Sequence, residues 1–213
     1  AYESADVDPA PEVPVVPGSF NVMFAGNIGE AQDFPAILDA AEQLRNRRDI
    51  RWLIVGDGRM AAWVDDEIAR RGLSNTVIML GRFPTDRMPS FFQHADALLV
   101  SLKADPLFAM TAPGKIQSYL ASGRPVLAML DGEGASVIEH AHAGLTGAAG
   151  DAAQLADNVL RLAAMTPAER ASMGQNGAAY AEREFRRAGL VDRLEGWLTE
   201  LAGKDVRASA GPA

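Results

Sequence analysis

The pattern that most constrains this chain is a regular alternation of short apolar runs with amphipathic stretches. The apolar runs lie at residues 21–25, 50–56, 76–81, 95–101 and 125–130. Helical periodicity separates them, as between the first two runs at Ile37, Leu38, Ala41 and Leu44. Near-continuous apolar runs of this length are typical of strands covered by helices on both faces. With right-handed crossovers, the alternation predicts an α/β fold, a Rossmann-like doubly wound parallel sheet.

The ends of the chain lack this alternation. Residues 1–19 carry several prolines and acids without periodicity, which predicts a disordered linker. Residues 204–213 are small and polar, and we expect them to form a disordered tail. The folded domain is therefore expected over residues 20–203.

The last part of that domain is predicted to be helical. Thr166 as N-cap, Pro167 at the first position and Glu169 at the third together indicate a helix start. A final helix has an apolar face formed by Leu190, Leu194, Trp197, Leu198 and Leu201. This face needs a partner, and we expect the domain's own sheet to supply it rather than a surface outside this chain.

Composition excludes several classes of function. The chain has no cysteine, so neither disulfides nor thiolate metal sites can form. Its formal charge of −8 argues against nucleic-acid binding, which needs a dense basic face. No apolar run approaches the roughly 20 residues of a membrane-spanning helix, and the first residues do not resemble a signal peptide. We therefore expect a cytoplasmic protein without a transmembrane segment.

Ligands of open parallel sheets bind outside the carboxyl ends of the strands, where glycine-rich turns and helix N-termini expose backbone N–H groups. The first such turn is Gly26-Asn27-Ile28-Gly29. Its glycines allow the backbone to approach a ligand closely. The same residues also suit a plain strand-to-helix turn, and the pattern alone favours neither interpretation.

The second turn, Gly56 to Ala61, matches the G-x-G-x-x-G/A dinucleotide fingerprint. That fingerprint normally follows the first strand of its unit, whereas another strand precedes it here. The acid expected about 20 residues later is also missing, and Leu80-Gly81-Arg82 occupies that region. We favour a turn that packs the next helix closely and positions Arg59.

The third turn runs from Thr111 to Ile116. Pro113 fixes φ at a helix start, and Gly114 leaves room for a ligand. The backbone N–H groups of Gly114, Lys115 and Ile116 would point outward at the positive end of the helix dipole, and Lys115 adds a full charge. This combination suits a phosphate or diphosphate. An ordinary proline-started helix with a solvated lysine is the alternative.

The segment Pro113–Ala128, PGKIQSYLASGRPVLA, closely resembles the C-terminal domains of family-four retaining glycosyltransferases, which are two-domain GT-B enzymes. It is most similar to the subgroup of colanic acid, capsule and O-antigen assembly. Four more segments lie in the family's order: FAGNIGEAQDF, IRWLIVGDGRMAAWV, VIMLGRFPTDRMPSFFQHADALLVSL and MGQNGAAYAEREF. The resemblance covers about residues 20–201.

The resemblance implies which residues bind the donor. The first turn would lie near the donor phosphates, Arg82 and Phe83 against the nucleotide base, and the third turn would hold the diphosphate. The implied donor-binding residues are Gly26, Asn27, Ile28, Gly29, Asp57, Arg59, Arg82, Phe83, Thr111, Pro113, Gly114, Lys115, Ile116 and Ser118. It assigns no catalytic residue and no metal ligand to this chain.

The sequence departs from the family at four positions. Two glutamates of many relatives, one of which grips the ribose, fall on Met110 and Ser118. Asn27 and Gln32 stand where many relatives carry an arginine and a lysine. The subgroup tends to share these changes, which leave the ribose and sugar contacts open.

Taken together, the resemblance implies the donor-binding domain of a retaining glycosyltransferase. It would transfer a sugar, by subgroup resemblance an N-acetylamino sugar, from a UDP-sugar to a polysaccharide or lipid-linked acceptor. No metal cofactor is expected, since Lys115 and helix N-termini can neutralise the leaving diphosphate. The acceptor-binding N-terminal domain is expected to be missing. The chain alone would then bind donor weakly and transfer no sugar, and the full-length protein would lie in the cytoplasm, peripheral to the inner membrane.

Three alternatives remain from the sequence. The first is an NAD(P)-binding oxidoreductase domain built on Gly56 to Ala61, for which no catalytic acid or base is evident. The second is a sugar-nucleotide epimerase of GT-B architecture, which would need more carboxylates and histidines in the cleft. The third is a non-catalytic GT-B relative, supported by Met110 and Ser118.

Overall fold

Six parallel strands form one sheet in the order β3-β2-β1-β4-β5-β6. The computed structural model describes residues 7–186, 191, 195 and 197–199. The strands are β1 (Phe20–Asn27), β2 (Ile50–Asp57), β3 (Val77–Gly81), β4 (Ala97–Ser101), β5 (Val126–Met129) and β6 (Gly144–Gly147). This order and the flanking helices confirm the Rossmann-like α/β prediction.

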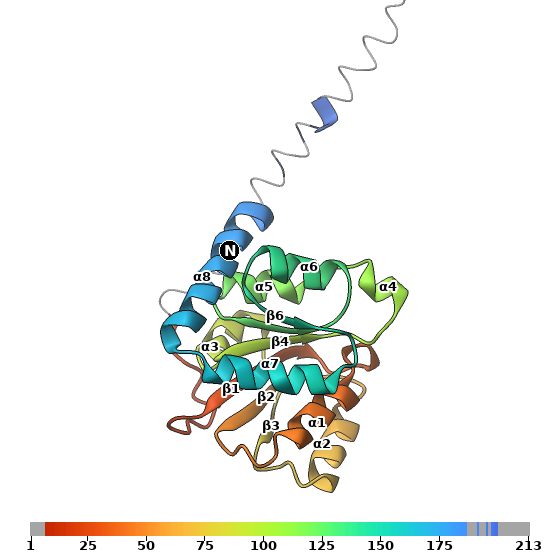
Figure 1. Ribbon diagram of the computed structural model, residues 1–213, viewed down its shortest axis with the longest axis vertical. Coiled ribbons are helices and arrows are strands. Elements are labelled where there is room, and N and C mark those ends of the chain that lie inside the picture. Colours follow the sequence, from red (N-terminus) through yellow and green to blue (C-terminus); the bar gives the residue numbers. More distant parts are fainter. Residues whose placement is uncertain (1–6, 187–190, 192–194, 196, 200–213) are drawn as a thin grey trace, which may run out of the picture.

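Helices cover both faces of the sheet (Figure 1). One face packs against α1 (Phe34–Gln43), α2 (Ala61–Arg70) and α7 (Ala152–Ala164). The other packs against α3 (Met88–Phe92), α5 (Lys115–Ala121), α6 (Glu133–His140) and α8 (Pro167–Phe185). Successive β1 residues alternate between the two cores, since Phe24 faces the first and Ala25 the second. Short helices η1 (Glu30–Gln32), η2 (Thr85–Arg87) and α4 (Pro106–Ala109) complete the fold.

Four of the described elements were not predicted from the sequence: η1, α4, α6 and β6. Strand β6 has the sequence GLTG, which offers a single large apolar residue and no alternation. Pairing with β5 along its whole length, rather than local propensity, makes it a strand. The sheet therefore has one strand more than the sequence pattern indicates.

The order of the strands reverses between β1 and β4. Strands β2 and β3 follow β1 on one side of it, and the chain then crosses to β4 on the other side of β1. The pairing of β1 with β2 continues to Asn27, whereas its pairing with β4 includes Val22 and Met23 alone. The carboxyl ends of β1 and β4 therefore diverge, and such a switch point is where ligands bind in this fold.

Residues 7–19, within the expected linker, pack on the domain. Ala10 and Val13 are buried in the core on the α3 face. The Ala10 N–H donates to the Ser90 carbonyl oxygen at 3.1 Å, and Arg51 donates to the Pro14 carbonyl oxygen at 2.7 Å. Only these two apolar side chains of the segment are buried, and two are too few to form a periodic pattern. The sequence therefore gives no sign that the segment packs against α3.

Parts of both chain ends lie outside the described residues. The parts left out are residues 1–6, the tail 204–213, and Leu190, Leu194 and Leu201 of the expected apolar face, among others. Trp197 and Leu198 of that face are described and exposed. Among the described residues, no helix has the length and apolar character needed to cross a bilayer.

Candidate functional site

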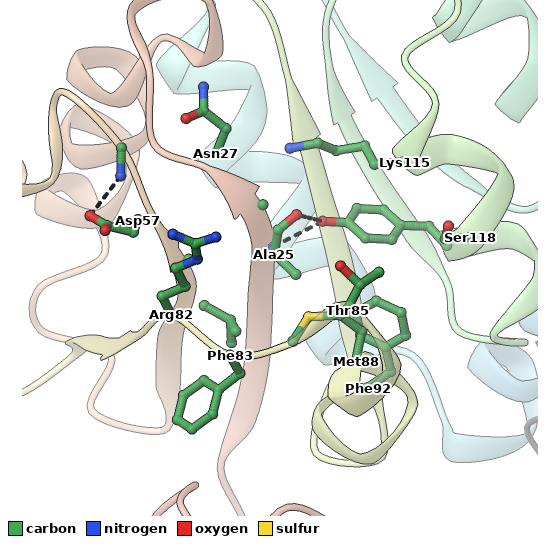
Figure 2. Close-up of a pocket in the computed structure, with 15 residues that line it drawn as sticks. Ala25, Asn27, Asp57, Arg82, Phe83, Thr85, Met88, Phe92, Lys115 and Ser118 are labelled. Carbon is green, nitrogen blue, oxygen red and sulfur yellow. Dashed lines mark hydrogen bonds between the residues drawn. The ribbon is translucent and has the colours of Figure 1, made fainter.

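A cavity of about 520 Å³ opens at the carboxyl ends of β1 and β2, next to the switch point (Figure 2). It brings together seven of the residues predicted from the sequence. These are Gly26, Asn27, Asp57, Arg82, Phe83, Lys115 and Ser118. Eight further residues complete the wall: Ala25, Val55, Gly56, Gly58, Thr85, Met88, Phe92 and Tyr119.

The floor of this cavity depends on close packing of two glycine turns. Gly56 has a φ of +147°, and a Cβ at this position would overlap the carbonyl oxygen of Gly26 on the neighbouring strand. A Cβ on Gly58 would overlap the carbonyl oxygen of Ile28. The Met60 N–H at the start of α2 also donates to that Ile28 oxygen, at 3.0 Å. The packing of the chain itself thus accounts for the glycines of the G-x-G sequence.

Lys115 is the most unusual group in the cavity. Its Nζ is buried and has no hydrogen-bond partner among the described residues. The nitrogen lies 3.9 Å from the centre of the Phe24 ring, and a Cβ on Gly26 would be 3.1 Å from it. Figure 2 shows the side chain extended toward the end of β1. Desolvation lowers the pKa of the Lys115 ammonium to about 8.

An unpaired buried cation is costly, and the ring of Phe24 offsets only part of that cost. Desolvation is the one cause of the lowered pKa, so no described carboxylate stabilises the charge. An anion entering between Gly26 and Lys115 would supply the missing partner. The geometry of this end of the cavity is therefore suited to a negatively charged group.

The opposite end of the cavity is more apolar. Phe83, Met88 and Phe92 line it together with Arg82 and Thr85 (Figure 2). Behind this wall, Phe83 packs on Phe91 with ring centroids 4.5 Å apart. Arg87 lies over both of these rings at about 6 Å. Such a surface suits a flat heterocycle with a few polar edges.

A second cavity of about 360 Å³ adjoins the first, and Asn27 lines both. Gly29 and Arg59 line this second cavity, with Gln32, Glu30, Ala31, Lys103 and Phe108. The Gly29 N–H donates to the Gln32 side-chain oxygen at 3.1 Å. Gln32 therefore holds the glycine turn in place through its side chain.

The remaining predicted residues line neither of these cavities. Ile28 is fully buried, and its N–H donates to the Asp57 carbonyl oxygen at 2.8 Å. Ile116 is also buried, and its N–H donates to the Pro113 carbonyl oxygen at 2.9 Å. Both residues hold the turns together through core packing and backbone hydrogen bonds.

At the third turn, the N–H groups of Gly114 and Lys115 have no hydrogen-bond partner among the described residues. The Ala112 N–H also has no partner among them, so three amides of this turn are open to a ligand. Thr111 is exposed, and its hydroxyl donates to the Phe108 carbonyl oxygen at 3.1 Å. Met110 is 78% exposed, whereas Ser118 lines the larger cavity, so the two positions where many relatives carry glutamates lie in different surroundings.

Sequence reasoning missed Tyr119, Thr85, Met88 and Phe92. Tyr119 could have been found, because it follows Lys115 by one helical turn and so shares its face of α5. The other three lie in η2 and α3, whose position against the cavity depends on tertiary packing rather than on any local motif.

Comparison with known proteins places this site in context. Residues 19–165, more than half of the chain, match the model of the family described as group 1 glycosyl transferases. The 2-deoxystreptamine glucosyltransferase of Streptomyces kanamyceticus is 27% identical over 140 residues, covering 65% of this chain and 35% of that protein. The putative colanic acid biosynthesis glycosyl transferase WcaI of Escherichia coli is 32% identical over 105 residues, covering 48% and 24%. The alignments thus span about a third or less of each curated relative.

Solved structures share the fold. Anabaena HepE in complex with UDP superposes with a TM-score of 0.74 at 21% identity, covering 86% of this chain and 49% of HepE. The C-terminal domain of the group 1 glycosyl transferase LpcC from Francisella tularensis superposes with a TM-score of 0.64 at 17% identity, covering 81% of this chain and 89% of that domain. At these identities the likeness concerns the fold alone.

Proposed function

We propose that this chain, which belongs to the group 1 glycosyl transferases, binds a nucleotide-sugar donor, UDP-linked, in the larger cavity. In this proposal it is the C-terminal, donor-binding half of a retaining family-four enzyme. The full-length enzyme transfers the sugar, an N-acetylamino sugar, to a polysaccharide or lipid-linked acceptor.

The observation that carries the proposal is the buried, unpartnered ammonium of Lys115. A nucleoside diphosphate supplies the negatively charged partner that this ammonium lacks, and it also has a flat base for the apolar end of the cavity. With the diphosphate beside Lys115 and Gly26, the base lies toward Phe83 and Phe92. The sugar then extends toward Asn27 and the second cavity.

The same arrangement supports a role in the chemical step. When the bond between the anomeric carbon and the diphosphate oxygen breaks, negative charge develops on the diphosphate. Lys115 and the open N–H groups of Gly114 and Lys115 are fixed donors for that charge in a partly desolvated site. Their contribution makes a metal ion unnecessary in this proposal.

The acceptor is assigned to a second domain. This chain corresponds to about half of HepE and to most of the isolated LpcC C-terminal domain, which supports a two-domain enzyme. Acceptor contacts and transfer therefore require the other half. The chain alone is expected to bind the donor and to transfer no sugar, and the whole enzyme is proposed to act at the cytoplasmic side of the inner membrane.

Calorimetric titration with UDP, GDP and NADH tests the proposal against an NAD(P)-binding domain. We expect UDP to bind, and to bind more tightly than NADH. Binding of NADH without UDP would contradict the donor assignment. The packing of Gly56 against Gly26 and of Gly58 against Ile28 already gives both glycines a role that needs no dinucleotide.

UDP affinity is expected to fall as pH rises through about 8, because Lys115 attracts the diphosphate only while its amino group is charged. The bound diphosphate raises the pKa of Lys115 again, so UDP binding is accompanied by proton uptake. Between pH 7 and pH 9 the loss is about tenfold. UDP itself contributes little to the change, since a terminal phosphate with a pKa near 6 is already about nine-tenths ionised at pH 7. Calorimetry in buffers of different ionisation enthalpy measures the proton uptake.

The control for this pH effect is Lys115→Arg. Its guanidinium stays charged throughout the range, so its UDP affinity should not change between pH 7 and pH 9. The other ionisable side chains lining the cavity are Asp57, Arg82 and Tyr119. The same pH dependence in Lys115→Arg would show that the titration does not belong to Lys115.

A further inference from the structure

The hydroxyl of Tyr119 makes two buried hydrogen bonds with the backbone of Ala25 near the end of β1. The Ala25 N–H donates to the hydroxyl oxygen at 2.9 Å, and the hydroxyl donates to the Ala25 carbonyl oxygen at 3.0 Å. Figure 2 draws both bonds at Ala25. In a continuous parallel sheet these two backbone groups would bond to a neighbouring strand. Tyr119 therefore takes the place of a strand at this point.

This replacement occurs where the sheet opens. Strand β1 pairs with β4 at Val22 and Met23, two residues before Ala25. A strand continuing beside Ala25 would close the crevice at the switch point. A single hydroxyl satisfies the same buried backbone groups and leaves the cavity open.

The Tyr119 ring also contacts the apolar end of the cavity. It packs edge-to-face on Phe92, with ring centroids 5.6 Å apart. Lys115 lies one turn earlier on the same face of α5. Tyr119 thus ties the helix that carries the cation to β1 on one side and to α3 on the other.

Apolar packing does not account for the hydroxyl. A phenylalanine would keep the ring and its contact with Phe92, but it would leave the Ala25 N–H and carbonyl oxygen buried without partners. Burial raises the pKa of Tyr119, so its hydroxyl stays protonated and keeps donating to Ala25.

We propose that Tyr119 is a positioning residue for the donor diphosphate: it holds Lys115 and the Gly26 end of β1 at the separation that the diphosphate requires. The proposal rests on the donor-binding function proposed above. Tyr119 acts through these two neighbours, since its hydroxyl is already occupied by Ala25.

The test is UDP binding by Tyr119→Phe, measured by calorimetry from pH 7 to pH 9 on protein shown to be folded by circular dichroism. We expect affinity to fall about tenfold at pH 7, because a small displacement of a binding group is enough for such a loss. We also expect the UDP affinity to depend less on pH, because the displaced Lys115 ammonium interacts more weakly with the diphosphate. Tyr180→Phe is the matched control, since Tyr180 packs against Phe185 in α8 away from the cavity.

Two results would overturn the positioning role. One is UDP affinity within about twofold of the wild type, which is a negligible free-energy difference. The other is weaker binding with the pH dependence unchanged, which would make Tyr119 a stabilising core residue. Failure of the wild type to bind UDP would be distinguishable from both, because it would overturn the donor-binding function itself.

A second measurement covers the case in which Tyr119→Phe does not fold. The wild-type chain, labelled with 3-fluorotyrosine, has three tyrosines, and Tyr180→Phe helps to assign their ¹⁹F signals. Saturation with UDP is expected to shift the Tyr119 signal and to leave that of Tyr180 in place. An unchanged Tyr119 signal in UDP-bound protein would contradict the positioning role.

Discussion

Lys115→Ala is expected to weaken UDP binding by about thirtyfold or more, because truncating one partner of a buried charge pair typically costs at least 2 kcal/mol. This loss of affinity should exceed the loss caused by removing the other cationic side chain of the cavity, Arg82. The Nζ of Lys115 is buried, and desolvation lowers its pKa. Calorimetric titration at pH 7 measures it.

The same variant should not lose stability. In the free chain the Lys115 ammonium has no partner, so its removal relieves a desolvation cost, and the free energy of unfolding should stay within about 1 kcal/mol of the wild type or rise. Arg48→Ala is the control, because it removes one exposed positive charge just before β2, at the opposite end of that strand from the cavity. Equal losses of affinity in both variants would mean that net charge, rather than a site at Lys115, governs binding.

Gly56→Ala is expected to lower stability by about 3 kcal/mol or more, since it combines a backbone overlap with a φ that side chains rarely adopt. Gly56 pairs with Gly26 across β1 and β2, and an added Cβ would overlap the Gly26 carbonyl oxygen. For a chain of this size the melting temperature should fall by roughly 6–12 °C. Thermal unfolding followed by circular dichroism measures the change.

Gly114→Ala provides the matched comparison for stability. Gly114 has a φ of −56°, and a Cβ there would meet nothing within 4 Å. Its melting temperature should remain near that of the wild type. Equal melting temperatures for Gly56→Ala and the wild type would show that the two turns are not packed as described, and would reopen a ligand-binding role for the G-x-G sequence.

Most of the fold is predictable from the sequence because the relevant signals are local. The apolar runs predicted five of the six strands, and Thr166, Pro167 and Glu169 correctly marked the start of α8. The Thr166 hydroxyl accepts from the Glu169 N–H, and the Glu169 carboxylate accepts from the Thr166 N–H, as a capping box requires. Strand β6 has no such signal, because its pairing with β5 alone defines it.

The candidate site is predictable to a smaller extent. Gly26 and Asp57 could be found because parallel strands place their carboxyl ends on one side of the sheet, and Lys115 because it begins the helix α5 on that side. The burial of the Lys115 Nζ, and the contribution of Met88 and Phe92 to the wall, depend on how α3 and α5 pack. No local pattern encodes these tertiary distances.

A crystal structure of this chain with UDP tests the donor-site assignment most directly. The predicted result has diphosphate oxygens within hydrogen-bond distance of the Lys115 Nζ, beside Gly26, and the base against Phe83. UDP bound at the start of α2, or anywhere without contact to Lys115, would contradict the assignment.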